Sequence, residues 1–217
     1  MKHIDKSKIL STEYKKWVDQ LEHDQVQHPE SRKYYVDVVM NLLHCQGGVC
    51  AYTEILLCDP ELVNKNKWKN GRYHDQEIER FGNLEHFDFH LKVDHTWQWE
   101  NLFLVYSDLN PMKGTQEVDE ILKPDLPDYN PFILMEYDVY EHMFIPHSDI
   151  ADDDRKERIR KMIKTLQLNH GRVRDQRKIF FKQMNDHHFT NSQFTPYQFF
   201  TAYEMAKAKN YVPLFCL

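Results

Sequence analysis

The chain has 217 residues, with 28 Lys and Arg against 34 Asp and Glu, and a formal net charge of −6. This length fits one domain or one domain with an appended helical region, and 41% apolar residues exclude a disordered or fibrous chain. The sequence has neither an apolar run of about 18 residues nor an apolar signal segment at its start, so we expect no membrane contact. The four cysteines form no CxxC pair, which indicates reduced thiols and a cytoplasmic protein.

The charge is unevenly distributed along the sequence. Residues 152–182 carry +6, residues 183–217 are neutral, and the first 151 residues therefore carry −12. An acidic N-terminal part followed by a basic segment suggests electrostatic steering of an anionic partner, although the negative net charge by itself argues against an anionic partner. The alternative is a solvated helix face with ordinary ion pairs.

The first half of the chain begins with two predicted helices, at residues 12–27 and 32–45. The second has one apolar face, and Ser31 is placed to cap its N-terminus. Gly47 and Gly48 follow, and paired glycines favour a chain reversal. Residues 49–53 then read as a short strand.

The middle of the chain alternates between loop and strand patterns. Residues 59–83 are rich in Asn, Lys, Gly and Asp and indicate an irregular surface loop. Residues 84–90 and 97–105 contain alternating or β-branched and aromatic residues, which favour two strands. Ser107 is placed to cap a helix that follows the second strand.

The last third of the chain begins with a proline-rich link at residues 123–131, which excludes regular structure there. Residues 132–145 favour strands. Residues 152–168 predict the clearest helix, because acidic residues come first and basic residues follow, as the helix dipole favours. Residues 171–186 predict a partner helix.

The segment from Leu84 to Gly114 carries the residues that suggest chemistry. A strand, a loop, a second strand and a short helix form the framework of a ββα-metal nuclease site. His86 supplies a base with an ordinary pKa of about 6.5. Glu85 and Asn110 supply oxygen ligands of the type that a hard divalent cation takes. Neighbours on a strand point to opposite sides, so Glu85 and His86 need a twist or bulge to share one site.

The order of these residues resembles that of the HNH endonucleases. More narrowly, the chain is similar to the PtuB nuclease subunit of Septu-type and retron-associated anti-phage systems. The segments that carry the resemblance are Leu42–Glu54, Leu84–Phe87, Trp99–Leu102, Asn110, Lys113–Gly114, Leu166–Asn169 and Arg177.

The resemblance implies an α+β fold, a mainly helical chain around a ββα-metal HNH core. It divides the chain into an N-terminal helical region (1–48), the HNH core (49–122) and a C-terminal region with basic helices (123–217). It implies that His86 is the general base and that Asn101 fixes the loop that positions it. Glu85 and Asn110 then bind Mg²⁺ or Mn²⁺.

The resemblance also implies partners. The expected substrate is DNA, and the expected companion is a PtuA-like ABC-type ATPase. The residues expected to contact nucleic acid are Lys113, Arg172, Arg174, Arg177 and Lys178. The alternatives are a non-catalytic subunit that docks on the ATPase, or the same site acting on RNA.

The chain departs from the family at its zinc-binding positions. Relatives often carry two Cys pairs that hold a structural zinc. Here the corresponding positions are Cys50 and Thr53, and Tyr106 and Leu109. Tetrahedral zinc needs four ligands, so we expect no structural zinc, and aromatic packing in its place (Tyr52, Trp97, Trp99 and Tyr106).

Overall fold

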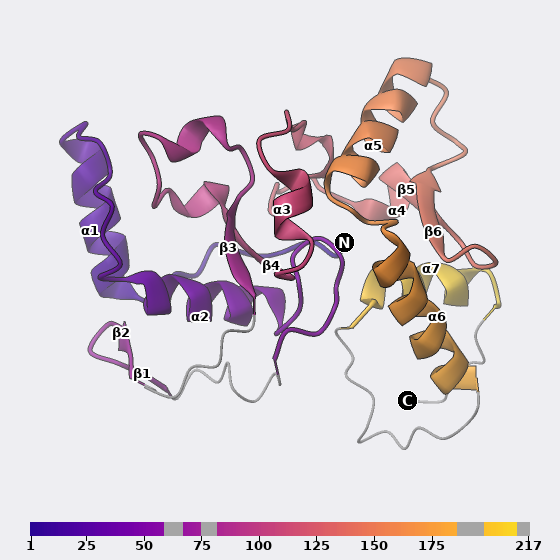
Figure 1. Ribbon diagram of the computed structural model, residues 1–217, viewed down its shortest axis with the longest axis horizontal. Coiled ribbons are helices and arrows are strands. Elements are labelled where there is room, and N and C mark those ends of the chain that lie inside the picture. Colours follow the sequence, from indigo (N-terminus) through magenta and orange to yellow (C-terminus); the bar gives the residue numbers. More distant parts are fainter. Residues whose placement is uncertain (59–66, 75–81, 186–197, 212–217) are drawn as a thin grey trace. The chain divides into compact units, whose positions relative to one another are not determined.

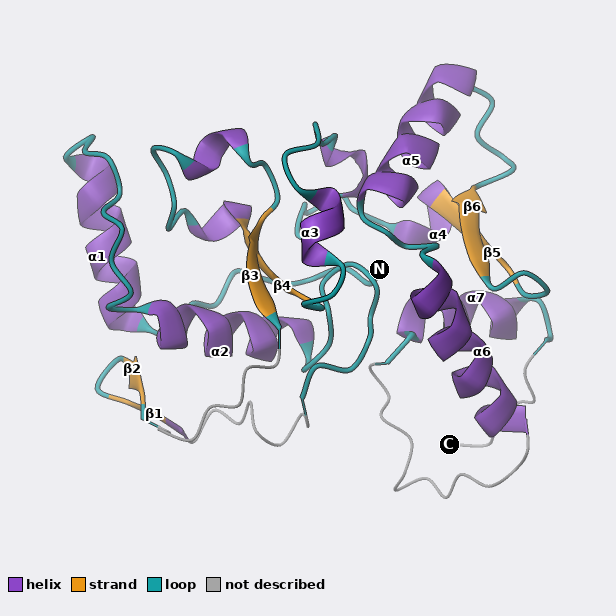
Figure 2. Cartoon of the chain, in the orientation of Figure 1, coloured by secondary structure: helices purple, strands orange, loops and turns teal. Residues whose placement is uncertain are grey.

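The computed structural model describes residues 1–58, 67–74, 82–185 and 198–211 (Figure 1). It combines helices with two-stranded antiparallel sheets, as expected for an α+β chain (Figure 2). The chain divides into two compact units. We call residues 4–51 and 56–118 the hairpin unit, and residues 1–3, 52–55 and 119–217 the C-terminal unit. These units differ from the three predicted regions, because the first two helices share a core with the central strands.

In the residues that the structure describes, the hairpin unit contains three α-helices and two antiparallel hairpins. Its helices are α1 (Thr12–His23), α2 (Tyr35–Gln46) and the one-turn α3 (Asn110–Lys113). Its strands are β1 (Trp68–Lys69), β2 (Arg72–Tyr73), β3 (Asn83–His86) and β4 (Leu102–Val105). β1 pairs with β2 and β3 pairs with β4. The order β3, β4, α3 is the ββα topology that the sequence predicts.

The ends of α1 and α2 show which sequence signals act locally. Ser11 caps α1, because its Oγ accepts a hydrogen bond from the Tyr14 N–H at 3.3 Å. Gly47 ends α2 with a left-handed φ of 68°, as predicted. The prediction for Ser31 is wrong: α2 has no side-chain cap, and Ser31 Oγ accepts from the Lys33 N–H in the preceding turn.

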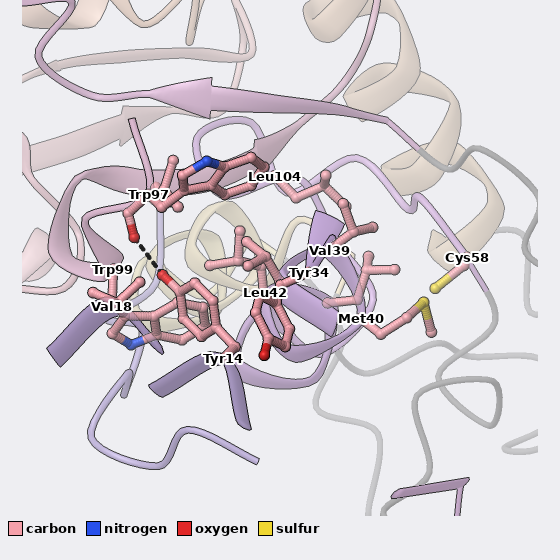
Figure 3. Close-up of a cluster of buried hydrophobic side chains, with 13 residues drawn as sticks. Tyr14, Val18, Tyr34, Val39, Met40, Leu42, Cys58, Trp97, Trp99 and Leu104 are labelled. Atoms are coloured by element: carbon pink, nitrogen blue, oxygen red, sulfur yellow. Dashed lines mark hydrogen bonds between the residues drawn. The ribbon is translucent and has the colours of Figure 1, made fainter. Parts of the chain in front are cut away.

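A cluster of buried side chains joins α1 and α2 to β4 and to the residues just before it (Figure 3). Leu42 and Leu104 are fully buried, and both Trp97 and Trp99 belong to the cluster. The Tyr14 hydroxyl donates to the Trp97 carbonyl at 2.5 Å. A buried aromatic ring thus satisfies its polar group while its apolar body packs in the core. Trp97 and Trp99 are two of the four aromatic residues predicted to pack in place of a zinc site, and this cluster includes neither Tyr52 nor Tyr106.

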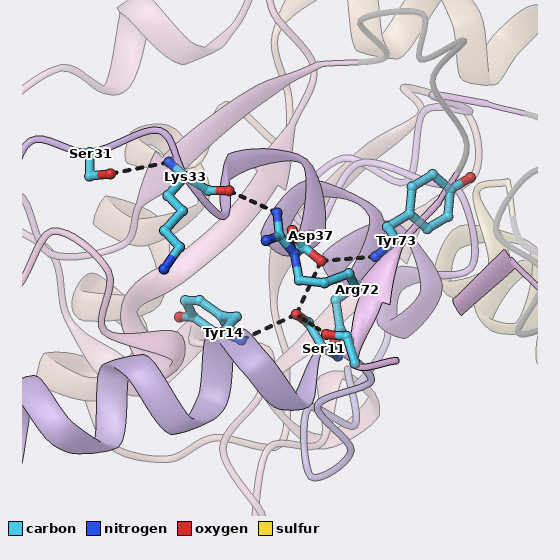
Figure 4. A network of polar contacts seen from close by, with 9 residues as sticks. Ser11, Tyr14, Ser31, Lys33, Asp37, Arg72 and Tyr73 are labelled. Atoms are coloured by element: carbon cyan, nitrogen blue, oxygen red, sulfur yellow. Dashed lines mark hydrogen bonds and ion pairs between the residues drawn. The ribbon is translucent and has the colours of Figure 1, made fainter. Parts of the chain in front are cut away.

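The buried carboxylate of Asp37 ties α2 to α1 and to the β1/β2 hairpin (Figure 4). It accepts hydrogen bonds from the Arg72 side chain at 2.9 Å, the Tyr73 N–H at 2.9 Å and the Ser11 hydroxyl at 3.2 Å. Because the charge is paired and hydrogen-bonded, its burial is compensated. Residues 67–74, predicted as part of an irregular loop, therefore form a hairpin fixed to two helices.

Three predictions around the central strands are wrong. Residues 49–53 do not form a strand: Val49 makes one isolated bridge to Leu56, and residues 51–53 form a turn before Glu54, whose φ is 59°. The second predicted strand starts later than expected, because Trp99–Asn101 forms a 3₁₀ turn ahead of β4. Ser107 likewise does not cap α3, which has no side-chain cap.

The C-terminal unit contains one hairpin and four helices within the described residues. Its helices are α4 (Pro131–Leu134), α5 (Asp153–Thr165), α6 (Gly171–Asn185) and α7 (Phe200–Ala208). Its strands are β5 (Met135–Asp138) and β6 (Met143–Pro146), which pair antiparallel. The predicted strands at 132–145 thus begin only after α4. Asn130 caps that helix by accepting from the Phe132 N–H at 3.0 Å.

Both predicted basic helices are confirmed. Asp152 caps α5 by accepting from two N–H groups of its first turn. The apolar stripe of α5 is buried and includes Ile159, Met162 and Ile163. In α6 the buried positions include Val173 and Phe181. Each helix therefore has one face in a core and its charged face outward.

Candidate active site

The β3/β4 hairpin places Glu85 and His86 at the end of β3. Glu85 pairs with Phe103 and His86 pairs with Leu102 in an unbroken antiparallel register. Adjacent residues of a strand point to opposite faces of the sheet. The described hairpin has no bulge at this point, so the two side chains begin on different sides.

The His86 ring contacts the loop that joins the two strands. Its Nε2 lies 2.9 Å from the Thr96 carbonyl oxygen. A carbonyl only accepts hydrogen bonds, so Nε2 carries the proton and the lone pair of the neutral ring lies on Nδ1. The contact therefore fixes both the orientation and the tautomer that a general base requires.

The surroundings of His86 favour its neutral form. Burial lowers the pKa of His86 below its ordinary value, and the positive charges of Lys92 and Lys113 lower it further. The hydrogen bond to Thr96 raises the pKa of His86 and is the second-largest influence, smaller than burial but larger than the effect of either lysine. At neutral pH the ring is uncharged and can accept a proton.

Glu85 is paired with Lys113, which α3 brings to the strand. The Lys113 Nζ lies 2.6 Å from a Glu85 carboxylate oxygen and also donates to the His86 carbonyl oxygen at 2.9 Å. Burial raises the pKa of Glu85, and the neighbouring Lys113 offsets part of that rise. The Lys113 side chain is only 3% exposed. This differs from the expectation that Lys113 contacts nucleic-acid phosphates, because its ammonium points into the site.

Asn101 closes the loop between the strands with three hydrogen bonds. Its side-chain oxygen accepts from the Asp88 N–H at 2.7 Å, and its side-chain nitrogen donates to the Asp88 carbonyl at 2.9 Å. Its backbone carbonyl accepts from the Phe87 N–H at 2.8 Å. The residues after His86 are thereby held against the start of β4. This is the geometry that a loop-fixing asparagine needs.

Asn110 is the first residue of α3 and is half-buried. The helix reaches β3 through Lys113, so Asn110 lies on the element that also contacts Glu85. Carboxylate and amide oxygens are the donors that Mg²⁺ and Mn²⁺ take, so the chemistry of Glu85 and Asn110 fits such an ion. Within the described ranges, no group of three His, Cys, Asp or Glu side chains is placed to hold a metal.

The sequence reasoning missed His28, which anchors the loop that carries Thr96. The buried His28 accepts from the Trp97 N–H through Nδ1 at 3.0 Å, and the backbone N–H of His28 donates to the Asp94 carbonyl at 3.0 Å. These bonds hold the loop on either side of Thr96. His28 is followed by Pro29 in the segment between two predicted helices, and this local sequence does not indicate the contact with the loop.

Three of the four zinc-site positions named from the sequence, Cys50, Tyr106 and Leu109, are joined by hydrogen bonds. The Tyr106 N–H donates to the Cys50 sulfur at 3.4 Å, and the Leu109 N–H donates to the Tyr106 carbonyl at 3.1 Å. Cys50 and Leu109 are both buried. In the hairpin unit, packing and backbone hydrogen bonds join these segments.

The expected nucleic-acid contacts on α6 fall into two groups. Arg172 and Lys178 are exposed, whereas Arg174 pairs with Glu141 at 2.9 Å. Arg177 is 1% exposed and donates to the carbonyls of Leu168 and His142. Burial lowers the pKa of Arg177 to about 10. Arg177 is thus a core residue of the C-terminal unit, and the expectation that it holds phosphates is corrected.

Comparison with known proteins gives no relatives for this chain. No family model, no curated protein and no solved structure matches it. Among the described residues, no helix is long and apolar enough to cross a membrane.

Proposed function

We propose that the chain is a metal-dependent HNH endonuclease that hydrolyses DNA. The observation that carries the proposal is the His86 imidazole, held by the Thr96 carbonyl at 2.9 Å in a ββα segment whose loop is closed by Asn101. A histidine with a fixed tautomer and a lowered pKa is suited to take a proton near neutral pH.

In the proposed reaction, His86 Nδ1 removes a proton from a water molecule. The water oxygen forms a bond to phosphorus, and the bond from phosphorus to the 3′ oxygen breaks. The leaving 3′ oxygen takes a proton from a solvent water, and the products are a 5′-phosphate and a 3′-hydroxyl. Asn101 holds the loop, and Glu85 and Asn110 would hold the ion. A bound Mg²⁺ or Mn²⁺ would supply stabilisation of the negative charge on the phosphate oxygens.

The proposed substrate contacts lie on the exposed cations of α6. Arg172 and Lys178 would bind backbone phosphates, which position a nucleic acid without reading its sequence. The biological setting that follows from the resemblance is a cytoplasmic effector of an anti-phage defence system. Its companion would be a PtuA-like ABC-type ATPase.

One observation favours a second candidate function. The Lys113 ammonium forms an ion pair with a Glu85 carboxylate oxygen at 2.6 Å. A divalent ion that binds this oxygen would have to compete with the ammonium. If the pair persists when metal is present, the chain keeps the HNH framework as a non-catalytic interaction subunit. Metal binding therefore separates the two candidates.

The activity test is cleavage of supercoiled plasmid in Mg²⁺ or Mn²⁺, with a single-stranded RNA assayed in parallel. We expect nicked or linear DNA, and a loss of about 10²–10⁴-fold in His86→Ala, the range typical of a lost general base. His90→Ala is the matched control, since His90 is an exposed histidine of the same loop. Cleavage by His86→Ala at the parent rate would show that the assignment is wrong.

The metal test is calorimetric titration of Mn²⁺ into the full chain. A binding isotherm that disappears in Glu85→Gln supports the nuclease. If the parent shows neither binding nor cleavage, the interaction subunit is favoured. Cleavage of RNA alone would replace the proposed substrate.

A further inference from the structure

The C-terminal unit contains an open groove of about 670 Å³ between β6 and α5. Its floor is mostly apolar and includes Phe144, Ile145 and Ile163. Ile145 is 39% exposed, although it is a large apolar side chain. A volume of this size lies within the range of roughly 300–1,000 Å³ typical of ligand-binding clefts.

A row of three cations lines the helical side of the groove. Lys156, Arg160 and Lys164 lie four residues apart on α5 and therefore share one face of the helix. Among the described residues, only Arg160 of these three has an ion-pair partner, Glu157 at 2.8 Å. The described residues that line the groove include no acidic side chain. The groove therefore presents an apolar floor and an excess of positive charge.

The backbone edge of β6 is already occupied, which excludes an added strand. Phe144 donates to the Asn169 side chain at 2.8 Å, and the same side chain donates to the Phe144 carbonyl at 2.7 Å. The His142 carbonyl accepts from Arg177, and Pro146 has no N–H. A partner must bind here through side chains.

We propose that this groove binds an acidic amphipathic helix of a partner protein. Lys156 and Lys164 are eight residues apart, which corresponds to about 12 Å along the helix axis at 1.5 Å per residue. A partner helix with Glu or Asp at every fourth position carries carboxylates at the same interval. Its apolar face would cover Ile145, in the helix-in-groove mode of recognition.

The floor of the groove disfavours nucleic acid as the occupant. Binding of a single strand relies on aromatic rings on which bases stack. Among the described residues, two aromatic rings line this groove: Phe144, which is only 5% exposed, and the half-buried imidazole of His170. The exposed floor is aliphatic, so it suits aliphatic side chains better than bases.

The experiment selects from a phage-displayed library of random 16-residue peptides on the full-length protein. We expect the enriched peptides to have acids at four-residue spacing beside an apolar face. Their affinity, measured by fluorescence anisotropy, should fall at least tenfold for the triple variant K156E/R160E/K164E and for Ile145→Asp. Lys182→Glu is the matched control, since Lys182 is exposed on α6 and does not line the groove, and it should bind these peptides as the parent does.

Folding is monitored in each variant by thermal unfolding, and only variants with a parent-like transition are compared. If the charge-reversed variant does not fold, Lys164→Glu alone provides the test. The inference is overturned if no peptide is enriched, if the peptides lack acids, or if they bind the groove variants as tightly as the parent. It is also overturned if labelled dT₂₀ binds and the groove variants weaken that binding tenfold. None of these outcomes depends on nuclease activity.

Discussion

At the scale of single residues, the pH dependence of cleavage tests the role of His86. The base must be neutral, and burial together with two lysines lowers the pKa of His86. We expect the rate to rise with pH in the acid range and to level off before pH 6.5, the ordinary histidine value. Single-turnover cleavage between pH 4.5 and 8 checks this. A rate that still rises tenfold per unit above pH 7 would contradict it.

His28 gives a second prediction, for stability. Burial and the nearby His95 lower the pKa of His28, so the unfolded chain binds more protons below about pH 6.5. The contribution of His28 to stability is therefore present above that pH and is lost as the pH falls. We expect His28→Leu to lose about 1–3 kcal/mol at pH 7, because the Trp97 N–H loses its acceptor. Urea unfolding measures the loss.

The matched variant is His28→Asn, whose side-chain oxygen can take the place of Nδ1. It should retain more stability than His28→Leu, and its stability should fall less steeply between pH 6.5 and 5 than that of the parent. Equal slopes for parent and His28→Asn would show that His28 does not carry this pH dependence.

At the scale of elements, the contact of α3 with β3 rests on the Lys113–Glu85 pair. Removing one partner of a buried ion pair costs about 3–5 kcal/mol, because a buried charge is left alone. We expect Lys113→Met to lose stability of this order without divalent ions. Because the competing ammonium is gone, Mn²⁺ should raise the melting temperature of Lys113→Met more than that of the parent.

The control for this prediction is the double variant with Lys113→Met and Glu85→Gln. It should recover part of the lost stability and should show no Mn²⁺-dependent shift. A shift that survives in the double variant would place the ion elsewhere.

The β1/β2 hairpin depends on Gly71. Its φ is +74°, and a Cβ at this position would lie 2.2 Å from the Thr12 hydroxyl oxygen. We expect Gly71→Ala to destabilise the chain by at least 1–2 kcal/mol in thermal unfolding. Asn70→Gly is the control, because Asn70 has a φ of 51° that glycine adopts without strain. Equal melting temperatures for Gly71→Ala and the parent would contradict the steric argument.

The elements that the sequence predicts well are those with strong local signals. The acidic start and basic continuation of α5 and the glycines after α2 are confirmed, because each signal acts within one helix. The strand predicted at residues 49–53 fails because residues 51–53 form a turn, which leads into the positive φ of Glu54. The ββα order was predictable, whereas the Lys113–Glu85 pair depends on residues 28 positions apart.

Helical periodicity in the sequence indicates that Arg177 is buried, whereas the many basic residues around it favour an exposed position. Val173, Arg177 and Phe181 are spaced four residues apart, so Arg177 lies on the apolar stripe of α6. Counting the run of basic residues grouped Arg177 with the exposed cations. Helical periodicity separates it from Arg172 and Lys178.

At the scale of the whole molecule, the difference between the exposed Lys178 and the buried Arg177 predicts which basic residues contribute to nucleic-acid binding. We expect Lys178→Ala to weaken DNA binding about equally across sequences and to reduce the slope of log affinity against log salt by about 1. Arg177→Met should instead change thermal stability, because methionine cannot donate the hydrogen bonds that the Arg177 guanidinium makes to the Leu168 and His142 carbonyls. Anisotropy titrations at several salt concentrations, alongside thermal unfolding, check both. Equal salt slopes for parent and Lys178→Ala would exclude the contact.

The two units alternate along the sequence, so a single cut of the chain does not separate them. Residues 52–55 belong to the C-terminal unit although they lie inside the stretch that forms the hairpin unit. Glu54 is buried there and accepts from the Thr201 N–H at 2.9 Å. A fragment of residues 119–217 would lack the Glu54 carboxylate, and the Thr201 N–H would lose its hydrogen-bond acceptor. The units are therefore not interchangeable modules, and recombination at a single crossover between them would break one of the two cores.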